Sequence, residues 1–195
     1  MNEYIKNTIA SSISTKEKLL EEVFINKIHT ASKIVLDAVR KKHKIIFAGN
    51  GGSAADSQHL AAEFVSRFEF DRPGLPSLSL STDTSMITAI SNDYGYKNLF
   101  SRQLEAQARE GDVFIGITTS GKSINIIEAF KTCKKNRIST IAFSGINGVE
   151  DSNNLNIDQI IDVPSNSTAR IQECHITIGH IICGIVEKEI FSDGV

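Results

Sequence analysis

The chain has 195 residues, a length that suits one domain with a substantial hydrophobic core. Its net charge of −2 at pH 7, without any dense basic stretch, argues against nucleic acid as a partner. No apolar run is long enough to span a bilayer and the first residues lack a signal-peptide pattern, so we expect a cytoplasmic protein with no membrane partner. The three cysteines show no C-x-x-C spacing, so neither a disulfide framework nor a zinc knuckle is expected.

Helical and strand patterns alternate along the chain. A long helix is predicted first, from Thr15 to about Arg40, because apolar residues recur there at three- and four-residue steps. The remaining pattern predicts, in order, a strand over 44–48, a helix over 54–68, a turn over 72–76, a strand over 78–80, helices over 86–90 and 99–109, a strand over 113–117, a helix from about 124, a strand over 140–143, a loop over 145–156, a strand over 160–163 and a helix over 169–190. This alternation predicts an α/β fold with a doubly wound parallel sheet. We divide the chain into a helical segment, 1–42, that packs on the domain or on an oligomer partner, and a domain over 43–195.

Two loops rich in glycine and hydroxyl residues follow predicted strands. The first covers residues 49–53 and the second ends at Ser123. Both open onto the carboxyl edge of the sheet, where proteins of this class bind their ligands. Each loop leads into a helix, whose unpaired N–H groups and positive dipole end favour an anion. The pair therefore suits a phosphorylated, polyhydroxylated substrate.

The second loop also permits a different interpretation. Residues 116–123 fit the nucleotide-binding pattern G-x-x-x-x-G-K-S/T. A nucleotide-binding loop of this kind also needs an acidic residue at the end of a second strand to help hold magnesium, and the strand over 140–143 ends without one. Gly116 moreover lies inside an apolar, strand-like run, which leaves little room for a loop that wraps phosphates. We therefore favour a phosphate loop without a nucleotide.

Two helices carry the candidate catalytic residues. His59 and Glu63 are four residues apart and share one helical face, so they could bind a metal or transfer protons, and Asp56 lies one turn earlier, where it could orient the imidazole. The last helix carries Gln172 and His180 among apolar residues. They are two turns apart, roughly 12 Å along a straight helix. Spacing alone therefore does not establish that they share a site.

Several motifs together are similar to those of the phosphoheptose isomerases, members of the sugar isomerase (SIS) group. They are the run from Phe47 to His59 through Glu63, the pairs Arg72-Pro73 and Asn92-Asp93, and the segments 109–112, 119–121 and 170–173. The resemblance extends from about residue 15 to the C-terminus. It implies a flavodoxin-like parallel sheet with an N-terminal helical extension. It also implies a homotetramer with active sites at subunit contacts.

The resemblance implies specific site residues. One Zn²⁺ per subunit would be bound by His59, Glu63, Gln172 and His180. Substrate contacts would fall on Asn50, Gly51, Gly52, Ser53, Glu63, Asn92, Asp93, Thr118, Thr119, Ser120, Ser123 and Gln172. Thr118 stands where many relatives have serine and keeps the hydroxyl. Lys122 stands where the family often has asparagine, and this change creates the match to the nucleotide-binding pattern.

The implied reaction converts D-sedoheptulose 7-phosphate to D-glycero-D-manno-heptose 7-phosphate through an enediol, the first step of nucleotide-activated heptose biosynthesis for lipopolysaccharide, capsule or another glycoconjugate. We assign Glu63 as the base that moves the carbon-bound proton and His180 as its acid/base partner, with zinc as a Lewis acid. An alternative is a non-catalytic tetramer that binds the bacterial replication initiator. Such relatives lack the acid at the Glu63 position and the imidazole at the His180 position, and this chain has both.

Overall fold

A five-stranded parallel sheet forms the centre of the protein. The computed structural model describes residues 1–191. Within them the strands follow the order β2-β1-β3-β4-β5, and every neighbouring pair is parallel. The strand bounds are Ile45–Gly49 (β1), Ser77–Ser79 (β2), Val113–Thr118 (β3), Ser139–Gly145 (β4) and Gln159–Val163 (β5). This is the flavodoxin-like order, so the predicted fold class is confirmed.

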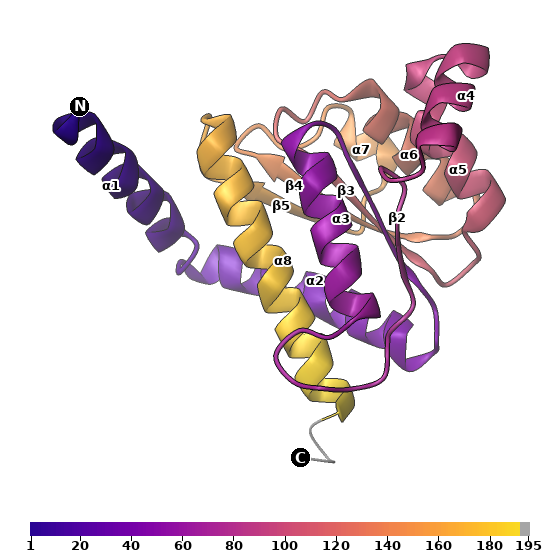
Figure 1. The fold of residues 1–195 in the computed structure, drawn as a ribbon, viewed down its shortest axis with the longest axis horizontal. Helices are drawn as coiled ribbons and strands as arrows, with labels where there is room; N and C mark the ends of the chain where they lie inside the picture. Colours follow the sequence, from indigo (N-terminus) through magenta and orange to yellow (C-terminus); the bar gives the residue numbers. More distant parts are fainter. Residues whose placement is uncertain (192–195) are drawn as a thin grey trace.

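Helices cover both faces of the sheet (Figure 1). The helix bounds are Asn2–Lys18 (α1), Glu22–Arg40 (α2), Gly52–Val65 (α3), Thr84–Tyr94 (α4), Leu99–Gln107 (α5), Ile124–Lys135 (α6), Ser152–Leu155 (α7) and Thr168–Phe191 (α8), with a 3₁₀ turn at Tyr96–Asn98 (η1). Apolar side chains of α2, α3 and α8 form one core with the sheet, and those of α5, α6 and α7 form a second core on the other face. The protein is therefore a three-layer α/β structure.

The central strands are mostly apolar because both of their faces are covered. All five residues of β1 are buried. Since successive side chains of a strand point to opposite faces, Ile45 and Phe47 enter the core shared with α3 and α8, whereas Ile46 and Ala48 enter the other. The sheet is thus fixed from both sides, and the loops at its carboxyl edge start from rigid positions.

The single helix predicted over 15–40 is wrong, because the structure divides this region into α1 and α2. Glu21 has extended backbone angles (φ −63°, ψ 138°) that interrupt the helix, and Leu19 turns into the core beside it. The break lets α2 lie against the sheet while α1 extends away from the body of the domain (Figure 1). Ser12 of α1 still donates a hydrogen bond to Glu173 of α8. The division at residue 42 stays a prediction.

His175, a second histidine of α8, belongs to the core. It is fully buried, and its Nε2–H donates to the carbonyl oxygen of Ser144 at 3.0 Å. Burial lowers the pKa of His175 to about 4, so the ring is neutral at pH 7. It serves the packing of α8 against β4.

None of the helices within residues 1–191 is long and apolar enough to cross a membrane.

Candidate active site

The two helices that carry the candidate catalytic residues lie side by side (Figure 1). Gly52 at the start of α3 lies against Gln172 of α8, and about two turns further along α3, Leu60 lies against Gly179. A Cβ atom at Gly179 would overlap the Leu60 side chain, so glycine permits this close approach. Leu60 and Gly179 are the chain neighbours of His59 and His180. The close approach of the helices therefore brings these two histidines together.

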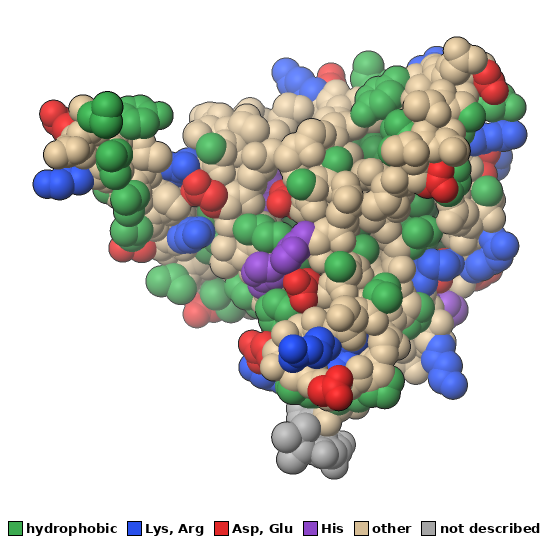
Figure 2. Space-filling view, in the orientation of Figure 1, with side chains coloured by type: hydrophobic (Ala, Val, Ile, Leu, Met, Phe, Trp, Pro, Cys, Tyr) green, Lys and Arg blue, Asp and Glu red, His purple; other side chains and the backbone are tan. Residues whose placement is uncertain are grey.

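His59, Glu63 and His180 form a cluster of possible metal ligands. The Nε2 atoms of the two histidines are 2.7 Å apart, and His59 Nε2 lies 3.3 Å from Glu63 Oε1. One ligand atom from each residue lies within 4.8 Å of the others, and His59 is exposed while the other two are half-buried. Figure 2 shows histidine and acidic side chains together at the surface over α3 and α8. Two imidazoles and one carboxylate are a common ligand set of catalytic zinc sites.

The surroundings keep this cluster able to bind a metal. Burial lowers the pKa of His180, the neighbouring His59 lowers it further, and Glu63 acts in the opposite direction. A neutral imidazole is the form that binds a metal. The nearby Cys183 offers no thiolate, because burial raises the pKa of its thiol to about 12. The donor set that fits a metal is therefore the two histidines and Glu63.

The glycine loop after β1 borders the crevice where the strand order reverses, between β1 and β3. Asn50 in this loop exchanges two amide hydrogen bonds with Asn125 of α6, at 3.0 and 2.8 Å, and also accepts one from the Tyr96 hydroxyl at 2.8 Å. Sequence reasoning missed Asn125 and Tyr96. The available signal was the polar Asn125 in the first turn of a helix, and the structure buries this residue to 3% exposure. These contacts fix Asn50 at the edge of the crevice.

The second loop is shorter than a nucleotide-binding loop. Strand β3 continues to Thr118, so only residues 119–123 separate it from α6. Gly116 is inside the strand, where a Cβ atom would lie 2.7 Å from the Phe130 ring. The glycine that completes the nucleotide-binding pattern therefore serves packing. The hydroxyls of Thr118 and Ser123 close the loop with a 2.9 Å hydrogen bond.

A cavity of about 260 Å³ opens beside this loop. Its lining is rich in hydroxyl and amide groups and comes from Thr119, Ser120, Lys122, Gly145, Ile146, Asn147, Ser165, Asn166, Thr168 and Ile171. Lys122 is the one charged residue among them. Sequence reasoning missed the contributions of Asn147 and Ser165, which follow β4 and β5, and of Thr168, which begins α8. The cavity offers hydrogen bonds and one positive charge, which suits a sugar phosphate.

Comparison with known proteins gives a consistent result. Residues 8–145 match the SIS domain family. A phosphoheptose isomerase from Sulfurimonas denitrificans is 56% identical over 196 residues, with 100% of both chains covered. The solved structure of a phosphoheptose isomerase from Francisella tularensis matches with a TM-score of 0.91 at 33% identity, covering 95% of this chain and 97% of that one. A phosphoheptose isomerase structure from Neisseria gonorrhoeae matches with a TM-score of 0.86 at 38% identity, covering 96% and 98%.

The chain belongs to the phosphoheptose isomerase family. The resemblance inferred from the sequence is therefore confirmed, and it extends over the whole length of the relative from Sulfurimonas denitrificans. In this chain the cluster of His59, Glu63 and His180 lies on the helix pair α3 and α8, and the two loops follow the paired strands β1 and β3.

Gln172 lies apart from the other three predicted zinc ligands. Its side-chain amide contacts Gly52 at the start of α3, two helical turns from His180 and thus roughly 12 Å away along α8. From this position the Gln172 side chain can contact a substrate that is held by the loop after β1. The role of Gln172 as a metal ligand stays a prediction.

The other predicted substrate contacts fall into two groups. Gly51 has a positive φ of 57° and precedes α3, and the backbone amide of Ser53 donates to the Asn50 carbonyl oxygen. Asn92 and Asp93 lie exposed on the last turn of α4, where the Asn92 amide donates to the Asp93 carboxylate at 2.8 Å. This turn leads into η1, whose Tyr96 hydroxyl reaches Asn50. Substrate binding by these residues stays a prediction.

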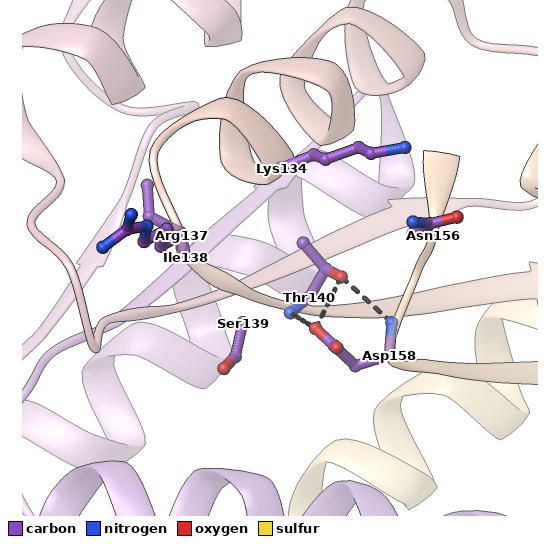
Figure 3. A pocket seen from close by; sticks show the side chains of 7 residues that line it. All are labelled: Lys134, Arg137, Ile138, Ser139, Thr140, Asn156 and Asp158. Carbon is purple, nitrogen blue, oxygen red and sulfur yellow. Dashed lines mark hydrogen bonds between the residues drawn. The ribbon is translucent and has the colours of Figure 1, made fainter. Parts of the chain in front are cut away.

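A further cavity, of about 290 Å³, lies at the amino ends of the strands, at the opposite edge of the sheet from both loops (Figure 3). Several of its polar groups already have partners: Asp158 accepts hydrogen bonds from the amide and hydroxyl of Thr140, and Lys134 donates to the Asn154 carbonyl oxygen outside the cavity. Arg137 points away from this group (Figure 3). The arrangement leaves little unsatisfied polarity for a ligand.

We predict that Gly179→Ala separates α3 from α8. The added methyl group overlaps Leu60, and overpacking of this kind costs about 1–3 kcal/mol of stability. The separation also moves His180 away from His59, so we expect zinc affinity, measured by competition with a chromophoric chelator, to fall at least about ten-fold, as for lost support of metal ligands. Thermal unfolding reports the stability change.

Gly184→Ala is the matched control on the same helix. The nearest atom to an added Cβ at Gly184 is a Phe68 ring carbon at 3.4 Å, an ordinary contact. Alanine there is expected to leave zinc affinity unchanged and to stabilise the helix by up to about 1 kcal/mol. Equal zinc affinities of the two variants would show that the close contact at Gly179 does not determine the cluster.

Proposed function

We propose that the protein interconverts D-sedoheptulose 7-phosphate and D-glycero-D-manno-heptose 7-phosphate. It is an aldose–ketose isomerase, as its full-length similarity to named phosphoheptose isomerases indicates. The observation that carries the proposal is the contact of His59, Glu63 and His180 in a chain of this family. A carboxylate and two imidazoles supply the proton-transfer groups that such an isomerisation requires.

The reaction moves one proton between two carbons and one between two oxygens. Glu63 removes the proton from C1 of the ketose and returns it to C2, which passes the substrate through an enediol. His180, kept neutral by its surroundings, moves the proton between the two oxygens. His59 lies 3.3 Å from the Glu63 carboxylate and restricts its orientation. A zinc ion held by these side chains would polarise the substrate carbonyl as a Lewis acid.

The two loops would hold the rest of the substrate. The phosphate fits the loop of residues 119–123, where hydroxyl groups, the N-terminus of α6 and the Lys122 ammonium favour an anion. Asn50 is positioned by Asn125 and Tyr96 to bind a sugar hydroxyl. Fixing both ends of a flexible sugar orients the reacting carbons toward the catalytic cluster.

The scaffold function considered as an alternative is less favoured. A tetramer that only binds the replication initiator needs neither an acid at position 63 nor an imidazole at position 180. In this chain both groups are present, and the fold brings them within one cluster with His59. Their proximity has a chemical use in an isomerase and none in a scaffold.

We also propose a homotetramer that works in the cytoplasm, with sites at subunit contacts, one Zn²⁺ per subunit and a product used for lipopolysaccharide or capsule. Apolar side chains on α1 support association: Ile5, Ile9 and Ile13 follow four-residue spacing and are 49%, 56% and 53% exposed. Green patches mark this helix in Figure 2. A groove beside His180 also exposes Ile181 and Ile185. Such apolar surfaces are typical of contacts between subunits.

Turnover in deuterated water tests the catalytic proposal. With zinc-loaded wild-type protein, we expect deuterium from the solvent at C2 of the aldose product. Glu63→Gln removes the base and is expected to lower turnover by about 10²- to 10⁴-fold, the usual contribution of a general base. Mass spectrometry of the product measures both rate and label.

Glu105→Gln is the matched control, since Glu105 is exposed on α5 and carries the same charge change. It is expected to retain wild-type turnover. No turnover by the zinc-loaded wild type would contradict the isomerase proposal, and full activity of Glu63→Gln would contradict the assignment of the base.

Lys122→Asn tests the phosphate site. An exposed ion pair is worth up to about 1 kcal/mol, so we expect KM for the sugar phosphate to rise about two- to five-fold while kcat stays near its wild-type value. The difference in KM is expected to shrink at high salt, because ions screen exposed charges. Lys135→Asn, at the other end of α6, removes the same charge and is expected to leave KM unchanged. Identical KM values for the two variants would exclude Lys122 from phosphate binding.

Ile9→Lys tests the proposed association through α1. A charge in the middle of an apolar contact is expected to dissociate the tetramer, because an unpaired charge is costly to bury. Sedimentation analysis measures the assembly state. Lys6→Glu on the same helix changes charge without disturbing Ile5, Ile9 or Ile13 and serves as the control. A monomeric wild type would refute the tetramer.

A further inference from the structure

A buried ion pair joins the ends of the two catalytic helices. Arg72, in the loop after α3, donates from Nε to the Glu187 carboxylate of α8 at 2.9 Å. The two side chains are only 3% and 1% exposed. Glu187 lies seven residues after His180 on α8, and Arg72 lies nine residues after Glu63. The pair is thus one of the contacts that hold α3 and α8 at a fixed spacing near the cluster.

Arg72 binds the backbone of Glu63 itself. Its Nη2 donates to the Glu63 carbonyl oxygen at 2.7 Å, and its Nη1 donates to the Phe64 carbonyl oxygen at 2.7 Å. These carbonyls belong to the last turn of α3, which has no further helical N–H groups to satisfy them. A cation at this end also complements the helix dipole. Arg72 therefore fixes the turn from which the Glu63 side chain projects.

Glu187 holds a second segment that reaches the cluster. Its carboxylate accepts hydrogen bonds from the backbone amides of Phe68 and Glu69, at 2.9 and 2.6 Å. Burial raises the pKa of Glu187, but these two amides and Arg72 together lower it below its ordinary value, so the group is ionised at pH 7. The Phe68 ring lies against the His180 ring, with centroids 5.4 Å apart. Glu187 thus supports the side chain that packs on His180.

We propose that Arg72 and Glu187 are positioning residues for the His59, Glu63 and His180 cluster. The inference deepens the proposed function and rests on it. One end of the ion pair fixes the Glu63 backbone and the other fixes the Phe68 ring against His180. Polar supports behind metal ligands set ligand orientation in this way. A buried ion pair adds little net stability compared with apolar packing, so its use here is geometric.

Arg72→Lys tests the inference. Lysine keeps the positive charge, but its single ammonium cannot reproduce the planar guanidinium fork that binds Glu187 together with the backbone carbonyl oxygens of Glu63 and Phe64. We expect the Zn²⁺ dissociation constant, measured by chelator competition, to rise about 10- to 100-fold. We expect kcat to fall with it, while KM for the sugar phosphate changes less than about two-fold, because the phosphate loop lies on another part of the domain. A merely structural role would leave the zinc affinity of the folded variant unchanged.

Arg40→Lys provides the matched control. Arg40 also pairs with a glutamate of α8, Glu189, at 3.1 Å, but both side chains are about half exposed and neither contacts the cluster. This substitution is expected to leave zinc affinity and kcat at wild-type values. Equal effects of Arg40→Lys and folded Arg72→Lys would overturn the inference.

A second variant keeps the test informative if Arg72→Lys does not fold. Phe68→Leu leaves the ion pair in place and removes only the ring that rests on His180. We expect weaker Zn²⁺ binding and a changed absorption spectrum of Co²⁺ bound in place of zinc. Unchanged binding and spectrum would overturn the link from Glu187 to His180. Failure of the wild type to bind Zn²⁺ would overturn the metal proposal together with this inference, whereas wild-type binding with unaffected variants would overturn the inference alone.

Discussion

The close contact between α3 and α8 is the constraint on which the candidate active site depends. His59 and His180 are 121 residues apart in the chain, yet their Nε2 atoms lie 2.7 Å apart. Only a residue without a side chain at position 179 lets the helices come so near at Leu60. The same contact places Glu63, one turn further along α3, within the cluster. A change of one ångström in the distance between α3 and α8 would alter the distance of His180 from both His59 and Glu63.

Near the C-terminal ends of α3 and α8, the contact between the two helices is reinforced by the ion pair of Arg72 and Glu187. Replacing Arg72 and Glu187 with apolar residues of similar volume could preserve or raise stability, because burying two charges is costly. Apolar residues could not bind the Glu63 carbonyl oxygen or the amides of Phe68 and Glu69. Hydrogen bonds have preferred directions, so the ion pair can specify the position of the last turn of α3, which hydrophobic contact alone specifies poorly.

The remaining parts of the site come from the sheet. The strand order reverses between β1 and β3, and this leaves a crevice flanked by the loop of Asn50 and the loop that ends at Ser123. One face of the sheet supports α3 and α8 with the proton-transfer groups, and α6 on the other face presents its N-terminus to the phosphate loop. In the proposed reaction, the two halves of the substrate would thus be bound by opposite layers. Strands β1 and β3 are hydrogen-bonded to each other, so the two loops that follow them start at neighbouring positions.

Local patterns in the sequence determined the alternation of strands and longer helices from β1 onward and the pairing of His59 with Glu63. Continuous apolar runs identify buried strands, and a four-residue spacing on one helix places two side chains on one face whatever the tertiary structure is. Sequence spacing could not show whether Gln172 or His180 lies close to His59. The position of His180 depends on how α8 is rotated and how closely it packs, and Gly179 sets this packing through a contact with Leu60 more than 100 residues away. The sequence also did not predict the contacts of Arg72 with Glu187 and of Tyr96 with Asn50. Packing between distant segments of the chain determines these partners, and the periodicity of the sequence carries no information about it.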